Sequence, residues 1–370
     1  MQKYIMTYSI AYLILINSLL TAYSKISYGI IPFILIYIFF YFLSRKIIFI
    51  HKSYFIILIT IIGMFIFIIL NNELEKVLIF NYIMYLYAFF AAYWLFSIDK
   101  YILMKVSYMT LMTYYLYFIC FGIFYGFSPV DINTYMPYAS RNQVSAYAIF
   151  LQILYTASYY RVNKKLPLFT SLFTFILCIL AFGRSGILCS GLIFIFSFFL
   201  LLFNGSKEQK KILKIILFFL IFLCVLQVNY IFDYISNYSS FQQGLESPRN
   251  LMNQQYLDEL DFQNLLLGIN LNLIPEILNY NLNPHNTFIL GHSHFGLINI
   301  ILFSLIVCIS SLIYLVWFKK SYVYVFLLMI FFLRIYFDVF MEHYFLMLLL
   351  FLFILESKKN QKICERYNYE

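Results

Sequence analysis

A few arginines and one histidine are the residues whose types best suit chemistry in this very apolar chain. They are Arg141, Arg184, Arg249 and His285, and each lies in or next to a segment that connects long apolar runs. A guanidinium group is always charged, and its fork of N–H donors matches the oxygens of a phosphate. A neutral histidine can act as a general base on a hydroxyl, because histidine ordinarily titrates near neutral pH. These residue types therefore predict binding of an anionic phosphate group together with activation of a hydroxyl nucleophile.

Each of these residues also has an ordinary structural interpretation. Arg141 can anchor a helix start at the membrane interface, and Arg184 can bond the carbonyl groups of a tight turn. Arg249 can be a solvated residue of a surface helix, and His285 can belong to the turn that follows Pro284. The residue types alone do not choose between these interpretations.

Two further groups of polar residues suggest other sites. His285, together with the H-x-H pair His292 and His294, allows a zinc site as an alternative, although such spacing is weakly specific and we expect no metal. Arg334, Asp338 and Glu342 recur at intervals of four, with His343 beside them, and pair with one another on one face if a helix runs through them. The alternative is a proton pathway or another contact to a phosphate, for which Arg334 is the candidate.

The composition decides the environment in which these residues work. Of 370 residues, 64% are hydrophobic and only 11% are charged, and the mean hydropathy is +0.85. A soluble surface needs about a quarter of its residues charged, so this composition predicts an integral membrane protein. The net charge of +9 is scattered over loops rather than gathered into one groove, which argues against nucleic acid as a partner.

The apolar segments predict an all-α protein with about twelve transmembrane helices. Continuous runs of this length cross about 30 Å of hydrocarbon as helices, whereas barrel strands are shorter and alternate in polarity. The runs lie near 4–23, 27–43, 53–70, 77–97, 102–126, 143–160, 166–182, 186–203, 212–230, 295–317, 322–337 and 341–356.

Charges on the connecting loops predict the topology. With a cytoplasmic N-terminus, most Lys and Arg residues fall on the cytoplasmic side, as the positive-inside rule requires. The bases left outside are Lys25, Lys76, Arg141, Arg184, Arg249 and Arg334. The predicted parts are helices one to nine over 1–230, an outer loop over 231–294, helices ten to twelve over 295–356 and a basic cytoplasmic tail over 357–370.

The long outer loop is expected to carry function, because structured loops of this length usually do. Ser247-Pro248 is typical of a helix start, and Leu251, Met252, Tyr256 and Leu260 follow at helical spacing. A second short apolar segment, 273–278, can rest on the bilayer surface or cap a cavity.

Several short motifs resemble those of the O-antigen polymerase and ligase superfamily. Gly183-Arg184-Ser185-Gly186 is similar to its Arg-containing turn, Ser140-Arg141-Asn142-Gln143 to its R-N helix start, and Arg249 to the arginine ahead of its loop helix. The loop elements are Leu266-Leu267-Gly268-Ile269-Asn270, where Asn270 replaces a second glycine, and Asn283-Pro284-His285-Asn286-Thr287 with Phe295-Gly296-Leu297-Ile298. A family Trp position is occupied by Met252 or Tyr256. The resemblance covers about residues 138–300.

The resemblance implies a metal-independent glycosyltransferase without a cofactor, located in the bacterial cytoplasmic (inner) membrane with both termini in the cytoplasm. Its substrate would be a polyprenyl-diphosphate-linked oligosaccharide, with the lipid bilayer and a chain-length regulator protein as partners. Arg184 and Arg249, with Arg141, would hold the diphosphate, and His285, with Asn286 beside it, would activate or position the acceptor hydroxyl.

Within this superfamily we expect a polymerase of surface-polysaccharide repeat units, such as O-antigen or capsule. An O-antigen ligase and a lipid-linked oligosaccharide flippase remain alternatives. A flippase would be expected to carry charges within its helix bundle and to lack a long structured outer loop.

Overall fold

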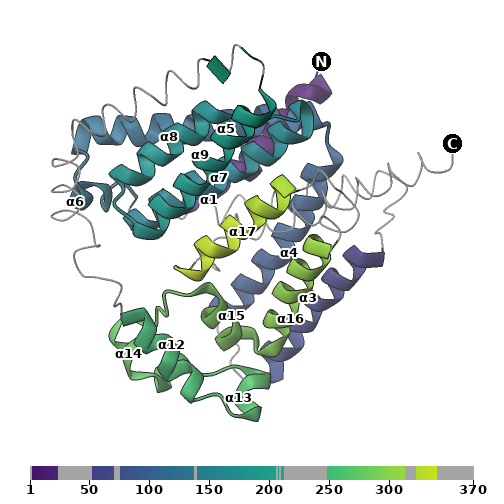
Figure 1. Cartoon of the computed structure of the whole chain (residues 1–370). Coiled ribbons are helices and arrows are strands. Elements are labelled where there is room, and N and C mark those ends of the chain that lie inside the picture. Colours follow the sequence, from purple (N-terminus) through teal and green to yellow (C-terminus); the bar gives the residue numbers. More distant parts are fainter. Residues whose placement is uncertain are drawn as a thin grey trace. The chain divides into compact units, whose positions relative to one another are not determined.

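The computed structural model describes residues 2–23, 52–70, 76–136, 140–205, 207, 210–211, 248–312 and 322–339. These residues form helices and no strands (Figure 1). The longer helices are α1 (Gln2–Tyr23), α3 (Lys52–Leu70), α4 (Lys76–Ser97), α5 (Lys100–Tyr125), α7 (Arg141–Asn163), α8 (Leu168–Leu180), α9 (Arg184–Asn204), α12 (Pro248–Asp258), α16 (Leu297–Leu312) and α17 (Tyr322–Tyr336). The shorter ones are α6 (Pro129–Ile132), α13 (Phe262–Leu267), η2 (Leu271–Leu273), α14 (Pro275–Asn279) and α15 (Thr287–Phe295). The all-α prediction is confirmed for this part of the chain.

Nine of the twelve predicted apolar helices coincide with helices of the structure, and the segments 27–43, 212–230 and 341–356 lie outside the described residues. The tenth helix was predicted to begin near residue 295, and α16 begins at Leu297. The helix before it, α15, was not predicted, and it is separate from α16 because Gly296 ends α15 with φ +60° and ψ −152°. That backbone region is open essentially only to glycine.

Two of the described helices are long and apolar enough to cross a membrane. They are α5, with a mean hydropathy of 1.4, and Arg184–Phe203 of α9, with 2.6. Shorter apolar helices include Ile57–Ile66 of α3 and Leu168–Leu180. On α3 the exposed apolar residues recur at helical spacing and form one stripe, made of Ile59, Ile62, Ile66 and Ile69. A stripe of this kind suits contact with hydrocarbon.

The chain divides into two compact units, and each is described by itself. Unit 1 comprises residues 1–103 and 248–370, and unit 2 comprises residues 104–247. In unit 1, α16 packs against α3, and α15 contacts α3, α16 and α17. In unit 2, α9 packs against α8 and α7, and α6 contacts α7.

The helices of unit 2 are joined by buried hydrogen bonds. Tyr114 Oη donates to the carbonyl oxygen of Val144 at 2.6 Å. Gln152 of α7 donates to Ser171 Oγ of α8 at 3.1 Å and accepts from Thr174 Oγ1 at 3.2 Å. Interhelical polar contacts of this kind are typical of helices in an apolar environment, where they fix which faces meet.

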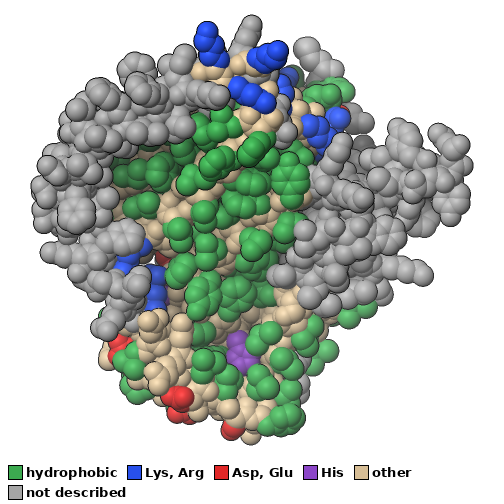
Figure 2. Space-filling model, viewed as in Figure 1, with side chains coloured by type: hydrophobic (Ala, Val, Ile, Leu, Met, Phe, Trp, Pro, Cys, Tyr) green, Lys and Arg blue, Asp and Glu red, His purple; other side chains and the backbone are tan. Residues whose placement is uncertain are grey.

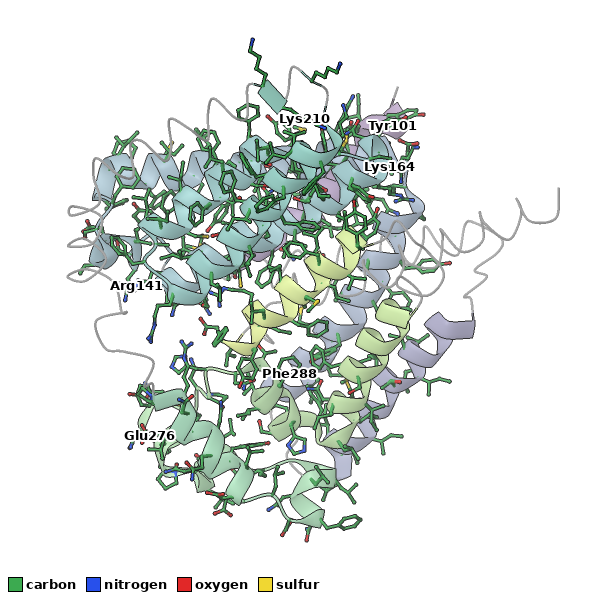
Figure 3. All side chains as sticks on the ribbon, in the orientation of Figure 1. Tyr101, Arg141, Lys164, Lys210, Glu276 and Phe288 are labelled. Carbon is green, nitrogen blue, oxygen red and sulfur yellow. The ribbon has the colours of Figure 1, made fainter. Side chains whose placement is uncertain are left out.

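The two ends of α7 in unit 2 carry different numbers of basic residues. Arg141 begins α7, whereas Arg161, Lys164 and Lys165 lie at or just past its other end. In Figure 3, Arg141 and Lys164 lie at opposite ends of this helix. The positive-inside prediction assigns Arg141 and the lysine-rich end to opposite sides of the membrane.

Part of the segment that was predicted to be an outer loop, here called the outer-loop segment, folds in unit 1 into α12, α13, η2 and α14. As predicted, α12 is amphipathic: its Met252 and Tyr256 are buried, but Leu251 is exposed. In the apolar segment 273–278, Ile274 and Ile277 are buried, whereas Leu273 and Leu278 are exposed. Asp258, Glu259 and Asp261, at the end of α12 and just after it, are exposed. Figure 2 shows acidic side chains at the surface.

The loop segment joins α15 through direct backbone contact. A Cβ atom added at Gly268 would lie 2.3 Å from the carbonyl oxygen of His292, and one added at Gly296 would lie 2.1 Å from that of Leu266. The segment around Gly268 and the segment around Gly296 therefore pack against each other without intervening side chains.

Candidate functional site

In unit 2, Arg141 and Arg184 are the first residues of two long helices. Arg184 was predicted to lie in a turn before the helix, but it is the first residue of α9, after the N-cap Gly183. The backbone N–H of Arg141 donates to Asn133 Oδ1 at 2.9 Å, and that of Ser140 donates to Gln143 Oε1 at 2.9 Å. The start of α7 is therefore fixed by side chains on both sides of Arg141.

The first turns of α7 and α9 lie against each other. A Cβ atom at Gly183 would lie 3.0 Å from Asn142 Oδ1, and one at Gly186 would lie 2.8 Å from Ser145 Oγ. Gly186 is needed at this position because any side chain would push the two helix starts apart. The glycines on either side of Arg184 thus bring its helix start next to the one that Arg141 begins.

The turn before Arg184 is held in an unusual conformation. Phe182 has φ +56° although it is not glycine, and its side chain is buried. A bulky residue in the left-handed region costs about 1–3 kcal/mol, which surrounding packing must offset. Only Ala181, Phe182 and Gly183 separate α8 from α9, so this conformation fixes where α9 begins.

These two helix starts favour an anion. The first N–H groups of each helix have no partner within the helix, and the helix dipole places partial positive charge there. Arg141 and Arg184 add two full positive charges, and both are only partly exposed. The arrangement is chemically suited to a group with two phosphates.

In unit 1, His285 lies in a tight turn before α15. It has φ +49°, and its backbone N–H donates to Asn283 Oδ1 at 2.9 Å. Its side chain is 27% exposed, and its ring meets that of Tyr280 edge-on. The neighbouring Asn286 caps α15, since its Oδ1 accepts the N–H of Phe288 at 2.9 Å. That cap uses the amide oxygen of Asn286, whose side chain is buried.

Asp338 lies beside His285, a contact that the sequence pattern did not predict. Its Oδ1 is 3.7 Å from His285 Nδ1, and its Oδ2 is 3.9 Å from Arg334 Nη2. The expected pairing of Arg334 with Asp338 is thus present, but α17 ends at Tyr336 and Asp338 lies beyond it. Glu342 and His343, the rest of that stripe, lie outside the described residues.

The charges around Asp338 keep it ionised. Burial raises the pKa of this carboxyl group, but the contact with His285 and the charges of Arg334 and Arg249 lower it by more, so the pKa is lowered overall. Three predicted site residues, Arg249, His285 and Arg334, therefore act on one carboxylate. Arg334 has 0% exposure, which places it inside the unit rather than at its surface.

His292 has a structural role in the outer-loop segment. Its Nε2 lies 2.9 Å from the carbonyl oxygen of Leu265, and its Nδ1 lies 2.6 Å from Tyr256 Oη. Because a carbonyl oxygen only accepts, Nε2 carries the proton, and Nδ1 accepts from Tyr256. Burial lowers the pKa of His292, which agrees with a neutral ring, although the bond to Leu265 opposes the shift. Burial also lowers the pKa of His294, to about 4.

The zinc alternative has little support here, because both ring nitrogens of His292 are engaged. Within the described ranges, no three metal-ligating side chains gather in one place.

The structure therefore brings together the predicted residues of each unit. Arg141 and Arg184 mark two adjacent helix starts in unit 2, and Arg249, His285 and Arg334 surround Asp338 in unit 1. Comparisons with protein-family models, curated proteins and solved structures find no match to this chain.

Proposed function

We propose that the protein polymerises lipid-linked repeat units of a surface polysaccharide at the outer face of the bacterial cytoplasmic membrane. The observation that carries this proposal is the pair of adjacent helix starts headed by Arg141 and Arg184, with the lysine-rich end of α7 at the opposite side. The motif resemblance supports the same reaction. In this proposal the chain crosses the membrane many times and has both termini in the cytoplasm.

Arg141 and Arg184 would bind the diphosphate of the donor. Diphosphate is already a good leaving group, and its charge grows as the bond to the sugar breaks. Fixed cationic donors stabilise that charge more in the transition state than in the ground state. Each charge-assisted hydrogen bond in a partly dehydrated site is worth about 1.5–3 kcal/mol.

His285 would take the proton of the acceptor. The acceptor hydroxyl oxygen forms a bond to the anomeric carbon of the donor sugar, and the bond from that carbon to the diphosphate oxygen breaks. Polyprenyl diphosphate leaves with the electron pair, and the hydroxyl proton passes to the imidazole. A positioned general base of this kind contributes about 10²- to 10⁴-fold to the rate.

The reaction needs no nucleotide sugar, because the lipid-linked donor carries its own leaving group. Such a donor suits a site outside the cytoplasm. Arg334 would act from the interior of unit 1 through Asp338, and Asn286 would orient the acceptor through its NH₂ group.

The test is elongation of a lipid-linked repeat unit by purified protein in lipid nanodiscs with EDTA present. Wild-type protein should lengthen the glycan. Arg184→Ala should lower kcat/KM by about 10²- to 10⁴-fold, since about two charge-assisted hydrogen bonds are lost. Arg184→Lys should fall between the two, because lysine keeps the charge but not the fork.

Arg161→Ala is the matched control, because Arg161 is an arginine at the other end of α7. It should elongate at the wild-type rate. Intact substrate that is never lengthened by wild-type protein would contradict the proposal. Transfer only to a different acceptor would indicate a ligase, and translocation without transfer would indicate a flippase.

A further inference from the structure

The surroundings of His285 contain a residue that the proposed function does not yet use. Asp338 is 6% exposed and comes from the segment after α17, 53 positions along the chain from His285. Of the charged groups that act on it, Arg334 lies on α17 and Arg249 on α12. A buried carboxylate next to a partly exposed imidazole is an arrangement that orients the imidazole.

The backbone around this pair is held firmly. Thr287 Oγ1 donates to the carbonyl oxygen of Asp338 at 2.7 Å, so residue 338 is tied to the first residue of α15. The N–H of Val339 donates to Asp338 Oδ1 at 3.0 Å. On the other side, Asn283 holds the backbone N–H of His285 at 2.9 Å. Both partners are therefore anchored within a few residues of Thr287.

His285 has a ring nitrogen that can donate a hydrogen bond, and Asp338 has a carboxylate oxygen that can accept it. Nδ1 of His285 is buried and has no hydrogen-bond partner among the described residues. Asp338 Oδ1 lies 3.7 Å from it. This distance exceeds that of a hydrogen bond by less than roughly 1 Å. Catalytic hydrogen bonds are often long without substrate and shorten when it binds.

We propose that Asp338 is a positioning residue that accepts the Nδ1–H of His285 and so leaves Nε2 as the basic nitrogen. This inference rests on the proposed function, in which His285 takes the acceptor proton. The carboxylate also stabilises the imidazolium that forms when the proton is transferred. Arg334, buried on the other side, holds Asp338 in its ionised form.

The first test is a double-mutant cycle in the elongation assay. Asp338→Asn should lower kcat by about 10- to 100-fold and leave KM within about threefold, as expected for the partner of a catalytic histidine. In a His285→Ala background, Asp338→Asn should cause no further loss, because Asp338 acts through His285. Asp258→Asn, an exposed aspartate of the same unit, is the control and should match wild type.

Wild-type kcat in Asp338→Asn would overturn the inference. So would an equal loss of kcat in the presence and absence of His285, because Asp338 would then act on stability or on another group. Failure of the proposed function gives a different result: wild-type protein itself would not elongate the glycan.

The second test does not depend on activity. Nitrogen NMR of ¹⁵N-histidine-labelled protein, with the His285 signals assigned by loss in His285→Ala, reports which ring nitrogen carries the proton. We expect Nδ1–H in wild type and mainly Nε2–H in Arg334→Met/Asp338→Leu. The double variant is used because removing Asp338 alone would leave the buried charge of Arg334 uncompensated. An Nε2–H ring in wild type, or an Nδ1–H ring that persists in the double variant, would overturn the inference.

Discussion

The two hydrogen bonds of His292 predict how firmly the outer-loop segment is held. His292→Ala removes both bonds and leaves the Tyr256 hydroxyl and the Leu265 carbonyl without their partner. Each buried group left unsatisfied costs about 1–3 kcal/mol, so we expect a loss of about 3–4 kcal/mol. Tyr256→Phe removes only one donor and should cost about 1–2 kcal/mol.

Hydrogen–deuterium exchange of peptides over 248–268 measures this loss, because these amides exchange when the segment opens locally. At pH 7, exchange should be faster by about 10²- to 10³-fold in His292→Ala and by about 5- to 30-fold in Tyr256→Phe. Tyr280→Phe, at an exposed tyrosine of the same segment, should leave exchange unchanged. Unchanged exchange in His292→Ala would refute the assignment of this histidine.

The same bonds predict a dependence on pH. The pKa of His292 is lowered in the folded state, so the unfolded state binds more protons near pH 6.5. The stabilisation is present above that pH and is lost as the pH falls towards the folded-state pKa. Protonation also removes the lone pair on Nδ1 that accepts from Tyr256. Relative to Tyr256→Phe at each pH, wild-type protein should therefore progressively lose its extra protection as the pH falls below about 6.5.

Three further predictions concern stability. Gly296→Ala forces a side chain into φ +60° and against the Leu266 carbonyl. It should therefore cost about 3 kcal/mol or more and lower Tm in detergent. An unchanged Tm would contradict the backbone contact. Burial lowers the pKa of His294 to about 4, so the stability of the protein falls as the pH drops below about 6.5. His294→Phe should therefore reduce the fall in Tm between pH 7 and pH 5. An equal fall in Tm would show that His294 is solvated. Tyr114→Phe loses the bond to Val144 and should cost about 1 kcal/mol by the same measurement, and no change in Tm would argue against that bond.

Much of the helical framework could be predicted from the sequence, because apolar runs of about 20 residues and their charged flanks are local features. The position of α12 was also predictable from Ser247-Pro248 and the spacing of Met252 and Tyr256. The separate helix α15 was not, since a single Gly296 interrupts an otherwise apolar run and its effect depends on contact with Leu266.

The arginines of the candidate site could be predicted from the sequence, but the contact between His285 and Asp338 could not. Arg141 and Arg184 were identified because they oppose the charge pattern of the loops, which is a property of the sequence. The contact of Asp338 with His285 joins residues far apart in the chain, and the pattern around Asp338 pointed only to Arg334. The role of His292 depends likewise on Tyr256 and Leu265, which no local signal connects to it.

The most direct test of the account is the binding of polyprenyl diphosphate itself, without any acceptor. The Kd for the purified protein in nanodiscs should rise by at least about tenfold in Arg184→Ala and in Arg141→Ala, and should remain unchanged in Arg161→Ala. Equal affinity in all four proteins would contradict the claim that the starts of α7 and α9 bind the diphosphate.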